Sequence, residues 1–129
     1  MSNRVYQGIR NHTGKPEVYV LENTSRRTLK DQLVLLFEPL EFDWGYKKGK
    51  EPRNLAIALL ADALEGGDDP NVDLLFQRLI DETVGTLPVD GWQITQTDLL
   101  AWVYGRIERI PIHPLPLKAI GGGVPGSLN

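Results

Sequence analysis

The sequence predicts a single α+β domain in which three helices cover one side of a small antiparallel sheet. Three observations support this prediction. Short runs of β-branched and aromatic residues stand near the N-terminus, apolar residues recur at helical spacing after Trp44, and the length of 129 residues suits one hydrophobic core. We place the domain at residues 1–109 and an extended Pro/Gly-rich tail at residues 110–129.

The N-terminal residues predict a β-hairpin. The runs RVYQGIR (4–10) and EVYVLE (17–22) have the composition of strands, and the NHTGKP segment between them contains the Asn, Gly and Pro that favour a chain reversal. The apolar run LVLLFEPLEF at 33–42 fits a helix or a strand by its period. Because Pro39 disfavours a long helix, we expect this run to add one strand to the hairpin.

The first helix is predicted at residues 52–65. Pro52 suits the first turn of a helix, and Gly66-Gly67 ends the pattern. Its apolar side chains recur at i, i+3, i+4, i+7 and i+8, as on one buried face: Ala56, Leu59, Leu60, Ala63 and Leu64.

Two further helices follow, and capping residues mark both of their beginnings. Asp69 followed by Pro70 is an N-cap with proline at the first helical position. Thr95 and Asp98 are close to a capping box, and this third helix must end before Pro111. We expect its buried face to consist of four apolar residues: Leu99, Trp102, Val103 and Ile107.

The tail contains several prolines and three consecutive glycines, so it cannot continue the third helix and should be extended. Its first part, residues 110–120, is apolar, and we expect it to dock on an apolar surface. That surface belongs either to the chain's own helices or to a neighbouring subunit, in which case the tail is a dimer arm. We expect residues 121–129 to stay loose.

The composition excludes several classes of chemistry. The chain has no cysteine, which rules out disulfides, thiolate catalysis and cysteine-based metal sites. His12 lies in the predicted turn and His113 in the tail, so we expect no catalytic imidazole, no metal site and no cofactor. Four acidic residues fit the solvent faces of their helices: Asp62, Glu65, Asp81 and Glu82. We therefore expect no catalytic residues, and a protein that is not an enzyme.

Hydropathy and charge bear on location and on nucleic acids. No apolar run reaches the roughly 20 residues that span a bilayer, so we expect a soluble cytoplasmic protein without membrane contact. Residues 1–53 carry ten Lys/Arg and seven Asp/Glu, whereas residues 54–129 carry four and ten. A basic half can mark a nucleic-acid surface, but its cations are dispersed and the isoelectric point is about 5.3. We therefore do not expect nucleic acid as a partner.

The candidate site is the junction before the first helix, FDWGYKKGKEP at 42–52. Aromatic and basic side chains stand there beside a helix N-terminus, whose free N–H groups favour anions. Six residues would hold a phosphate-bearing, nucleotide-like ligand: Trp44, Tyr46, Lys47, Lys48, Lys50 and Arg53. The spacing does not match a phosphate-binding P-loop, and Glu51 stands where the anion would bind. In the structural alternative, Gly45 permits a tight turn and the aromatics seal the sheet against the helix.

The motifs of the chain follow one another in a distinctive order. Tyr6-x-Gly8-x-Arg10 is followed by Phe42-x-Trp44-Gly45-Tyr46, Pro52, LAIALLAD at 55–62, and Leu87-Pro88 with Trp92. This order resembles a family of small uncharacterised domains of bacteria, archaea and their phages. The resemblance covers residues 4–104 and implies an accessory gene of a prokaryote or of a mobile element. It implies no activity, cofactor or catalytic residue.

The sequence thus favours a small non-enzymatic accessory or interaction protein of a prokaryote or its virus, which acts by binding a protein partner or by self-association. A module that binds a small anionic ligand at the junction is the alternative. Nucleic-acid binding ranks third.

Overall fold

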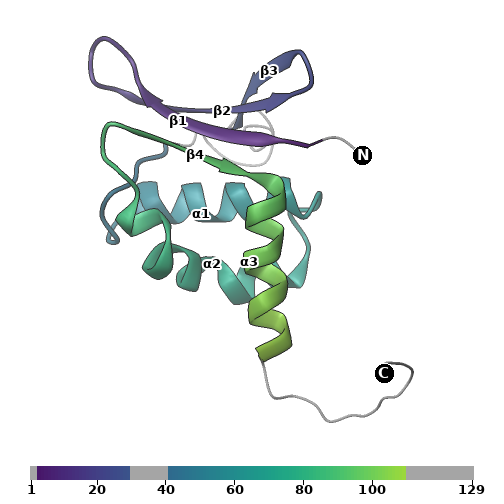
Figure 1. Ribbon diagram of the computed structural model, residues 1–129. Coiled ribbons are helices and arrows are strands. Elements are labelled where there is room, and N and C mark those ends of the chain that lie inside the picture. Colours follow the sequence, from purple (N-terminus) through teal and green to yellow (C-terminus); the bar gives the residue numbers. More distant parts are fainter. Residues whose placement is uncertain (1–2, 30–40, 110–129) are drawn as a thin grey trace, which may run out of the picture.

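The computed structural model describes residues 3–29 and 41–109, which form a four-stranded antiparallel sheet with helices on one side (Figure 1). The strand order is β3-β2-β1-β4. The strands are β1 (Val5–Arg10), β2 (Pro16–Glu22), β3 (Ser25–Thr28) and β4 (Gly91–Thr95). The helices are α1 (Lys50–Ala63), α2 (Pro70–Glu82), the short 3-10 helix η2 (Val84–Thr86) and α3 (Gln96–Arg109). The predicted α+β fold, with three helices covering an antiparallel sheet, is confirmed.

The N-terminal hairpin forms as predicted. Strand β1 pairs with β2 in one continuous register, from Val5 opposite Leu21 to Arg10 opposite Pro16. The turn is organised by Asn11, whose side-chain oxygen accepts hydrogen bonds from the backbone N–H groups of Thr13 and Lys15 at 2.9 and 3.0 Å. Asparagine therefore closes this hairpin through its side chain.

The strands added to the hairpin differ from the predicted one. Most of the strand expected at 33–42 lies outside the described residues, as does the predicted tail at 110–129, and the described Glu41 and Phe42 belong to no strand. The added strands are β3, which extends the sheet beyond β2, and β4, which pairs with β1. Strand β4 has only five residues and its partner lies far away in the sequence, so its local pattern gave little sign of it.

Helix α1 lies between the sheet and α2 (Figure 1). Its sequence is apolar around most of its circumference, which is typical of a helix that is buried on several sides. Leucines supply burial worth about 1.5–3 kcal/mol each, and alanines let neighbouring elements approach closely. The buried apolar positions are Leu55, Ala56, Ala58, Leu59, Leu60, Ala61 and Ala63.

Both predicted helix caps are present. The Asp69 side chain accepts a hydrogen bond from the Asn71 N–H at 2.9 Å, at the N-terminus of α2. Thr95 Oγ1 accepts from the Asp98 N–H at 3.0 Å, at the N-terminus of α3. Each bond satisfies a backbone donor that the helix itself cannot pair.

Helix α3 packs on the domain through a narrow seam of buried residues, Gln96, Leu99 and Val103. Gln96 Nε2 donates to the Ala63 carbonyl at 3.0 Å, which joins α3 to the C-terminal end of α1. Of the predicted buried face, Leu99 and Val103 are buried, whereas Trp102 and Ile107 are only partly covered. All four predicted residues therefore lie on the packed face of α3, and Trp102 and Ile107 keep part of their surface accessible.

Candidate functional site

Trp44, one of the predicted site residues of the junction, lies in the hydrophobic core. Trp44 is 1% exposed, and its indole Nε1 donates to the Val89 carbonyl at 3.1 Å. Its ring meets the ring of Trp92 edge to face, with centroids 5.5 Å apart and planes at 89°. This geometry is favourable for an aromatic pair and leaves no free ring face for a ligand on that side.

Arg10 fixes the junction to the sheet, and the sequence prediction did not include it. Its Nε donates to the Val89 carbonyl at 2.7 Å and its Nη2 to Asp43 at 2.8 Å. Its guanidinium carbon lies 4.8 Å from the centroid of the Trp44 ring, a cation–π arrangement. The available signal was the alternation Tyr6-x-Gly8-x-Arg10, which places Arg10 on the core side of β1.

Tyr46 is the exposed aromatic of the junction, with 41% of its surface accessible. Its hydroxyl donates to Asp43 Oδ2 at 3.4 Å, so Asp43 accepts from both Tyr46 and Arg10. Partial burial, and then the Asp43 carboxylate, raise the pKa of Tyr46 above its ordinary value. The Tyr46 side chain is therefore a neutral hydrogen-bond donor near neutral pH.

Two glycines shape the turn between the aromatics and α1. Gly45 has a φ of 87° and donates its N–H to the Val84 carbonyl at 3.0 Å. Gly49, with a φ of 108°, stands directly before the helix. Both backbone conformations are in the left-handed region that favours glycine, so this part of the structural interpretation agrees with the geometry.

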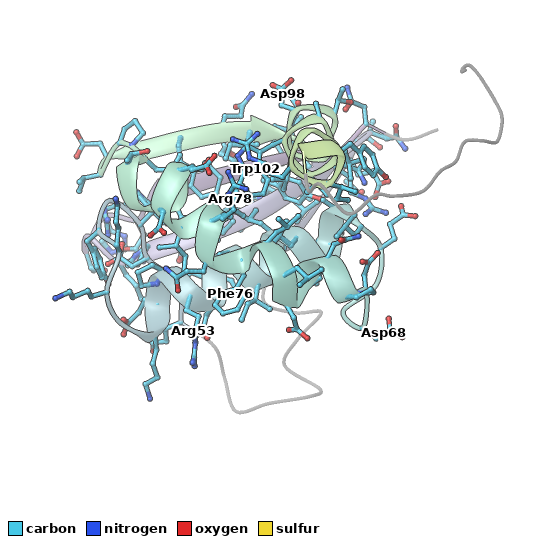
Figure 2. The ribbon with its side chains drawn as sticks, turned by 90° about the horizontal axis from the view of Figure 1, so that it is seen from below. Arg53, Asp68, Phe76, Arg78, Asp98 and Trp102 are labelled. Atoms are coloured by element: carbon cyan, nitrogen blue, oxygen red, sulfur yellow. The ribbon has the colours of Figure 1, made fainter. Side chains whose placement is uncertain are left out.

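The basic residues of the junction lie on the surface of the protein. The stem of Lys47 lies against Gly85, where an added Cβ would be 2.4 Å from Lys47 Cγ. Lys48, Lys50 and Arg53 are exposed, and Figure 2 shows Arg53 pointing away from the molecule. At the N-terminus of α1, the Glu51 carboxylate lies beside Gly49, with Oε1 3.2 Å from a Cβ built there. A protein carboxylate therefore stands at the helix end that would attract an anion.

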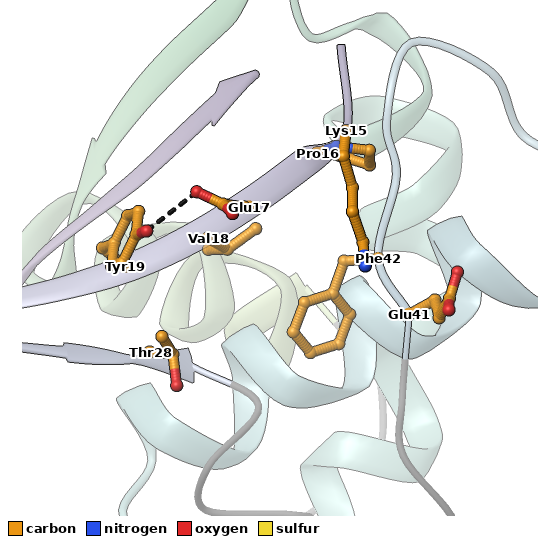
Figure 3. A pocket seen from close by; sticks show the side chains of 8 residues that line it. All are labelled: Lys15, Pro16, Glu17, Val18, Tyr19, Thr28, Glu41 and Phe42. Carbon is orange, nitrogen blue, oxygen red and sulfur yellow. Dashed lines mark hydrogen bonds between the residues drawn. The ribbon is translucent and has the colours of Figure 1, made fainter. Parts of the chain in front are cut away.

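A small hollow lies between the β2–β3 pair and the segment before the junction (Figure 3). It holds about 140 Å³, well below the roughly 300–1,000 Å³ of common ligand pockets. The sequence did not point to it. Its lining combines charged and aromatic side chains with aliphatic ones: Lys15, Pro16, Glu17, Val18, Tyr19, Thr28, Glu41 and Phe42.

Asp62 forms a buried polar cluster, which corrects the prediction that it faces solvent. Its side chain is 1% exposed and accepts from Tyr6 Oη at 2.8 Å, from Arg27 Nη2 at 2.7 Å and from Arg4 Nη1 at 3.2 Å. The prediction failed because the sheet covers the side of α1 that bears Asp62. Glu65 does face solvent, with 64% of its side chain exposed. Asp62 follows the apolar run LAIALLA at 55–61, and this position was the sequence signal that could have indicated its burial.

The Asp62 cluster has the features of a structural tie rather than of a reactive site. It joins α1 to β1 through Tyr6 and to β3 through Arg27, and Arg4, the residue before β1, also reaches the carboxylate. Burial, and then the Asp62 carboxylate, raise the pKa of Tyr6 far above its ordinary value. Tyr6 therefore stays protonated and donates its hydrogen bond at any ordinary pH.

A second polar cluster holds α3 to the end of α2. Glu82 accepts from Trp102 Nε1 at 3.2 Å, from Arg78 Nε at 3.0 Å and from Arg106. The Arg106 guanidinium also lies 4.5 Å from the centroid of the Trp102 ring. The Arg106 hydrogen bond lowers the pKa of Glu82, although partial burial opposes the shift. Figure 2 shows Trp102 and Arg78 on the same side of α3.

The opposite flank of α3 is apolar, and among the described residues no polar cluster like that of Glu82 joins it to another element. Leu100, Tyr104 and Ile107 stand at i, i+4 and i+7, so they share one side of the helix. Tyr104 is 52% exposed, and the other two side chains are partly exposed. We call these three residues the α3 flank. The sequence prediction placed Ile107 on the buried face of α3 and named neither Leu100 nor Tyr104.

Within residues 3–29 and 41–109, no group of three or more His, Cys, Asp or Glu side chains is placed to hold a metal ion. None of the helices in this part of the chain is long and apolar enough to cross a bilayer.

Comparison with known proteins gives a family but no relative of known activity. Residues 6–105 match the profile of a family of unknown function, DUF6166. No curated protein and no solved structure matches the chain. The matched range contains every helix and strand described above except the first residue of β1 and the last turn of α3. The chain therefore belongs to the DUF6166 family, a family of unknown function.

Proposed function

We propose that this protein is a small non-enzymatic accessory protein of a prokaryote or its virus, and that it acts in the cytoplasm by binding a protein partner through the α3 flank. The observation that carries this proposal is the apolar series Leu100, Tyr104 and Ile107, in which Tyr104 is exposed and the other two side chains are partly exposed beside the core. A spacing of i, i+4 and i+7 is the one by which a helix presents anchor side chains to an apolar groove or to another helix.

The composition of the flank supports a protein partner. Tyrosine is enriched among residues that dominate binding energy, since it combines a large apolar ring with a polar end. Tyr104 has no hydrogen-bond partner within the described residues, so its hydroxyl is available to a partner. The flank also stands on a rigid element, because Gln96, Leu99 and Val103 anchor the same helix.

The geometry gives less support to a small anionic ligand at the junction. Of its two aromatics, Trp44 is buried between Arg10 and Trp92 and only Tyr46 is exposed. The lysines are exposed, the stem of Lys47 lies against Gly85, and Glu51 competes for the helix N-terminus. Nucleic-acid binding has no supporting observation beyond the same exposed cations.

Site-specific cross-linking tests the proposal in cells of the natural source. A photoreactive phenylalanine analogue at position 104 should cross-link to one defined protein, whereas the same analogue at exposed Leu74 on α2 should not. The partner so identified is then purified and its affinity measured by calorimetry. Tyr104→Ser should weaken binding at least tenfold, about 1.4 kcal/mol, while Leu74→Ser should leave it unchanged. Equal affinities for both variants and the unmodified protein would refute the α3 flank as the binding surface.

A further inference from the structure

Strand β4 forms one edge of the sheet, and within residues 3–29 and 41–109 no strand pairs with its outer side. It bonds to β1 on one side, and Figure 2 shows it at the margin of the molecule, with α3 continuing from its C-terminal end. No described strand lies beyond it. A sheet edge exposes backbone N–H and C=O groups in a row, and these groups can bond to another strand.

The hydrogen-bond phase of the β1–β4 pair shows which backbone groups face outward. The Gln96 N–H donates to the Arg4 carbonyl at 2.7 Å, which continues the register one pair beyond Val5 and Thr95. In an antiparallel ladder, pairs that exchange hydrogen bonds alternate with pairs that do not. Ile94 and Trp92 therefore bond to β1, and the backbone groups of three residues point to the free edge: Gly91, Gln93 and Thr95.

Some of these outward groups already have partners. The Gly91 N–H donates to the Pro88 carbonyl at 3.3 Å. Thr95 caps α3, so its carbonyl accepts the first bond of that helix. Four groups of the described edge remain: the N–H and C=O of Gln93, the N–H of Thr95 and the C=O of Gly91.

The two edges of the sheet are protected to different degrees. Edge strand β3 has four residues, and two of them are Arg26 and Arg27, whose charges discourage pairing with another strand. Strand β4, GWQIT, contains no charged residue and no proline. An edge without such charges is open to pairing with another strand.

We propose that β4 pairs antiparallel with β4 of a second copy of this chain, around a two-fold axis at Gln93. The Gln93 N–H of each copy would donate to the Gln93 carbonyl of the other. The Thr95 N–H of each copy would donate to the Gly91 carbonyl of the other. The four groups left free on one edge are thus complementary to the same four groups on a second copy, as an isologous interface requires. The sheet becomes continuous across both copies.

Small side chains on α3 favour this pairing. The side of α3 opposite its buried seam carries Ala101 and Gly105, the smallest side chains of the helix, and nothing lies within 4 Å of a Cβ built on Gly105. The exposed Val89, just before β4, would be covered by α3 of the second copy. Asp90 and Asp98 flank the strand and would approach each other across the axis. Added salt should therefore strengthen the association, because it screens like charges.

Two variants of the full chain test the proposal by sedimentation equilibrium. Proline at an edge position keeps the strand but lacks the N–H, and Gln93 has its N–H on the free side. Gln93→Pro should weaken dimerisation at least tenfold because both central bonds are lost, whereas the matched control Gln93→Ala should dimerise like the unmodified protein. A monomeric unmodified protein at millimolar concentration, or equal dimerisation of both variants, would refute β4 pairing.

Amide hydrogen exchange keeps the test decisive if Gln93→Pro fails to fold. In the unmodified protein, the Gln93 and Thr95 amides should exchange slowly at high concentration and rapidly after dilution, whereas the Ile94 amide should stay protected in both. Rates at Gln93 that do not respond to dilution would refute the proposal. The α3 flank is a separate surface, so Tyr104→Ser should leave the mass unchanged. If Tyr104→Ser dissociates the dimer and Gln93→Pro does not, the interface is the α3 flank and not β4.

Discussion

The indole of Trp92 lies against the backbone of Gly8, its cross-strand partner in the β1–β4 pair. A Cβ atom built on Gly8 would fall 2.3 Å from Trp92 Cε2 and Nε1, so any side chain larger than hydrogen would displace the ring. The same indole meets Trp44 edge to face. The missing side chain of Gly8 therefore allows two tryptophans to join the sheet to the junction.

We expect Gly8→Ala to destabilise the domain by about 1–3 kcal/mol, because the ring is wedged against Trp44 and cannot move without loss of that contact. Urea unfolding measures this change. Gly105→Ala is the matched control, because nothing lies within 4 Å of a Cβ built on Gly105. Gly105 stands inside α3, where alanine is the better helix former, so this substitution should stabilise the domain by up to about 1 kcal/mol. Opposite signs for the two changes are expected, and a neutral Gly8→Ala would contradict the packing argument.

The second prediction separates a structural junction from a binding one. Trp44→Ala should lower the free energy of unfolding by about 3–5 kcal/mol, since it removes a buried ring and the Nε1 bond to Val89. Tyr46→Ala should cost less than about 1 kcal/mol, because Tyr46 is 41% exposed. An unchanged melting temperature for Trp44→Ala, together with loss of a binding activity, would favour a ligand site instead.

The third prediction concerns the Asp62 cluster. Asp62→Asn should destabilise by about 3 kcal/mol, near the lower limit for breaking buried ion pairs, because Arg4 and Arg27 keep side-chain exposures of 16% and 30%. Glu65→Gln should cost less than about 1 kcal/mol, although Glu65 also pairs with Arg4, at 3.0 Å. Chemical unfolding of both variants measures the difference. Equal losses would mean that burial of Asp62 has no energetic consequence.

The fourth prediction tests the anion alternative directly. Nucleotides and polyphosphate should not raise the melting temperature, since the junction cations are exposed to solvent and Glu51 stands at the helix N-terminus. The control is a triple variant, Lys47→Gln with Lys48→Gln and Lys50→Gln. A stabilising shift in the unmodified protein that disappears in the triple variant would overturn this expectation and establish an anion site.

Elements that depend on local chemistry could be predicted from the sequence. The caps Asp69 and Thr95 act on N–H groups two or three residues away, and Asn11 closes its own turn, so neighbouring residues suffice to identify them. The helical spacing of apolar residues located α1, α2 and α3 for the same reason.

Features that depend on distant partners could not be predicted. Strand β4 is held by β1, 86 positions away along the chain (Gln93 opposite Gln7). Asp62 is buried because Tyr6, Arg27 and the neighbouring Arg4 meet it from distant segments. Arg10 was overlooked at the candidate site because its partners, Asp43 and Val89, come from two other segments. Sequence spacing identified the aromatic residues of the junction but not what surrounds them.

The last prediction concerns residues 110–129, which lie outside the described residues and were predicted to form a docked apolar tail. Their sequence begins directly after α3, whose flank of Leu100, Tyr104 and Ile107 is the nearest apolar surface along the same helix. Eleven extended residues, 110–120, reach about 34 Å at roughly 3.1 Å each, whereas α3 with its 14 residues is about 21 Å long. The tail is therefore long enough to return along the whole of α3.

We expect deletion of residues 110–129 to lower the melting temperature, because water would then cover apolar surface that the tail had buried. The mass by sedimentation should stay the same if the tail docks on its own helices, since pairing through β4 does not involve it. A fall in mass would instead identify the tail as an arm that grips a neighbouring subunit. The control deletes residues 121–129 alone. The glycines and small polar residues of this segment should contribute nothing to the melting temperature or to the mass. If the full deletion also changed neither quantity, the tail would be a free linker, and the α3 flank would be open to a partner at all times.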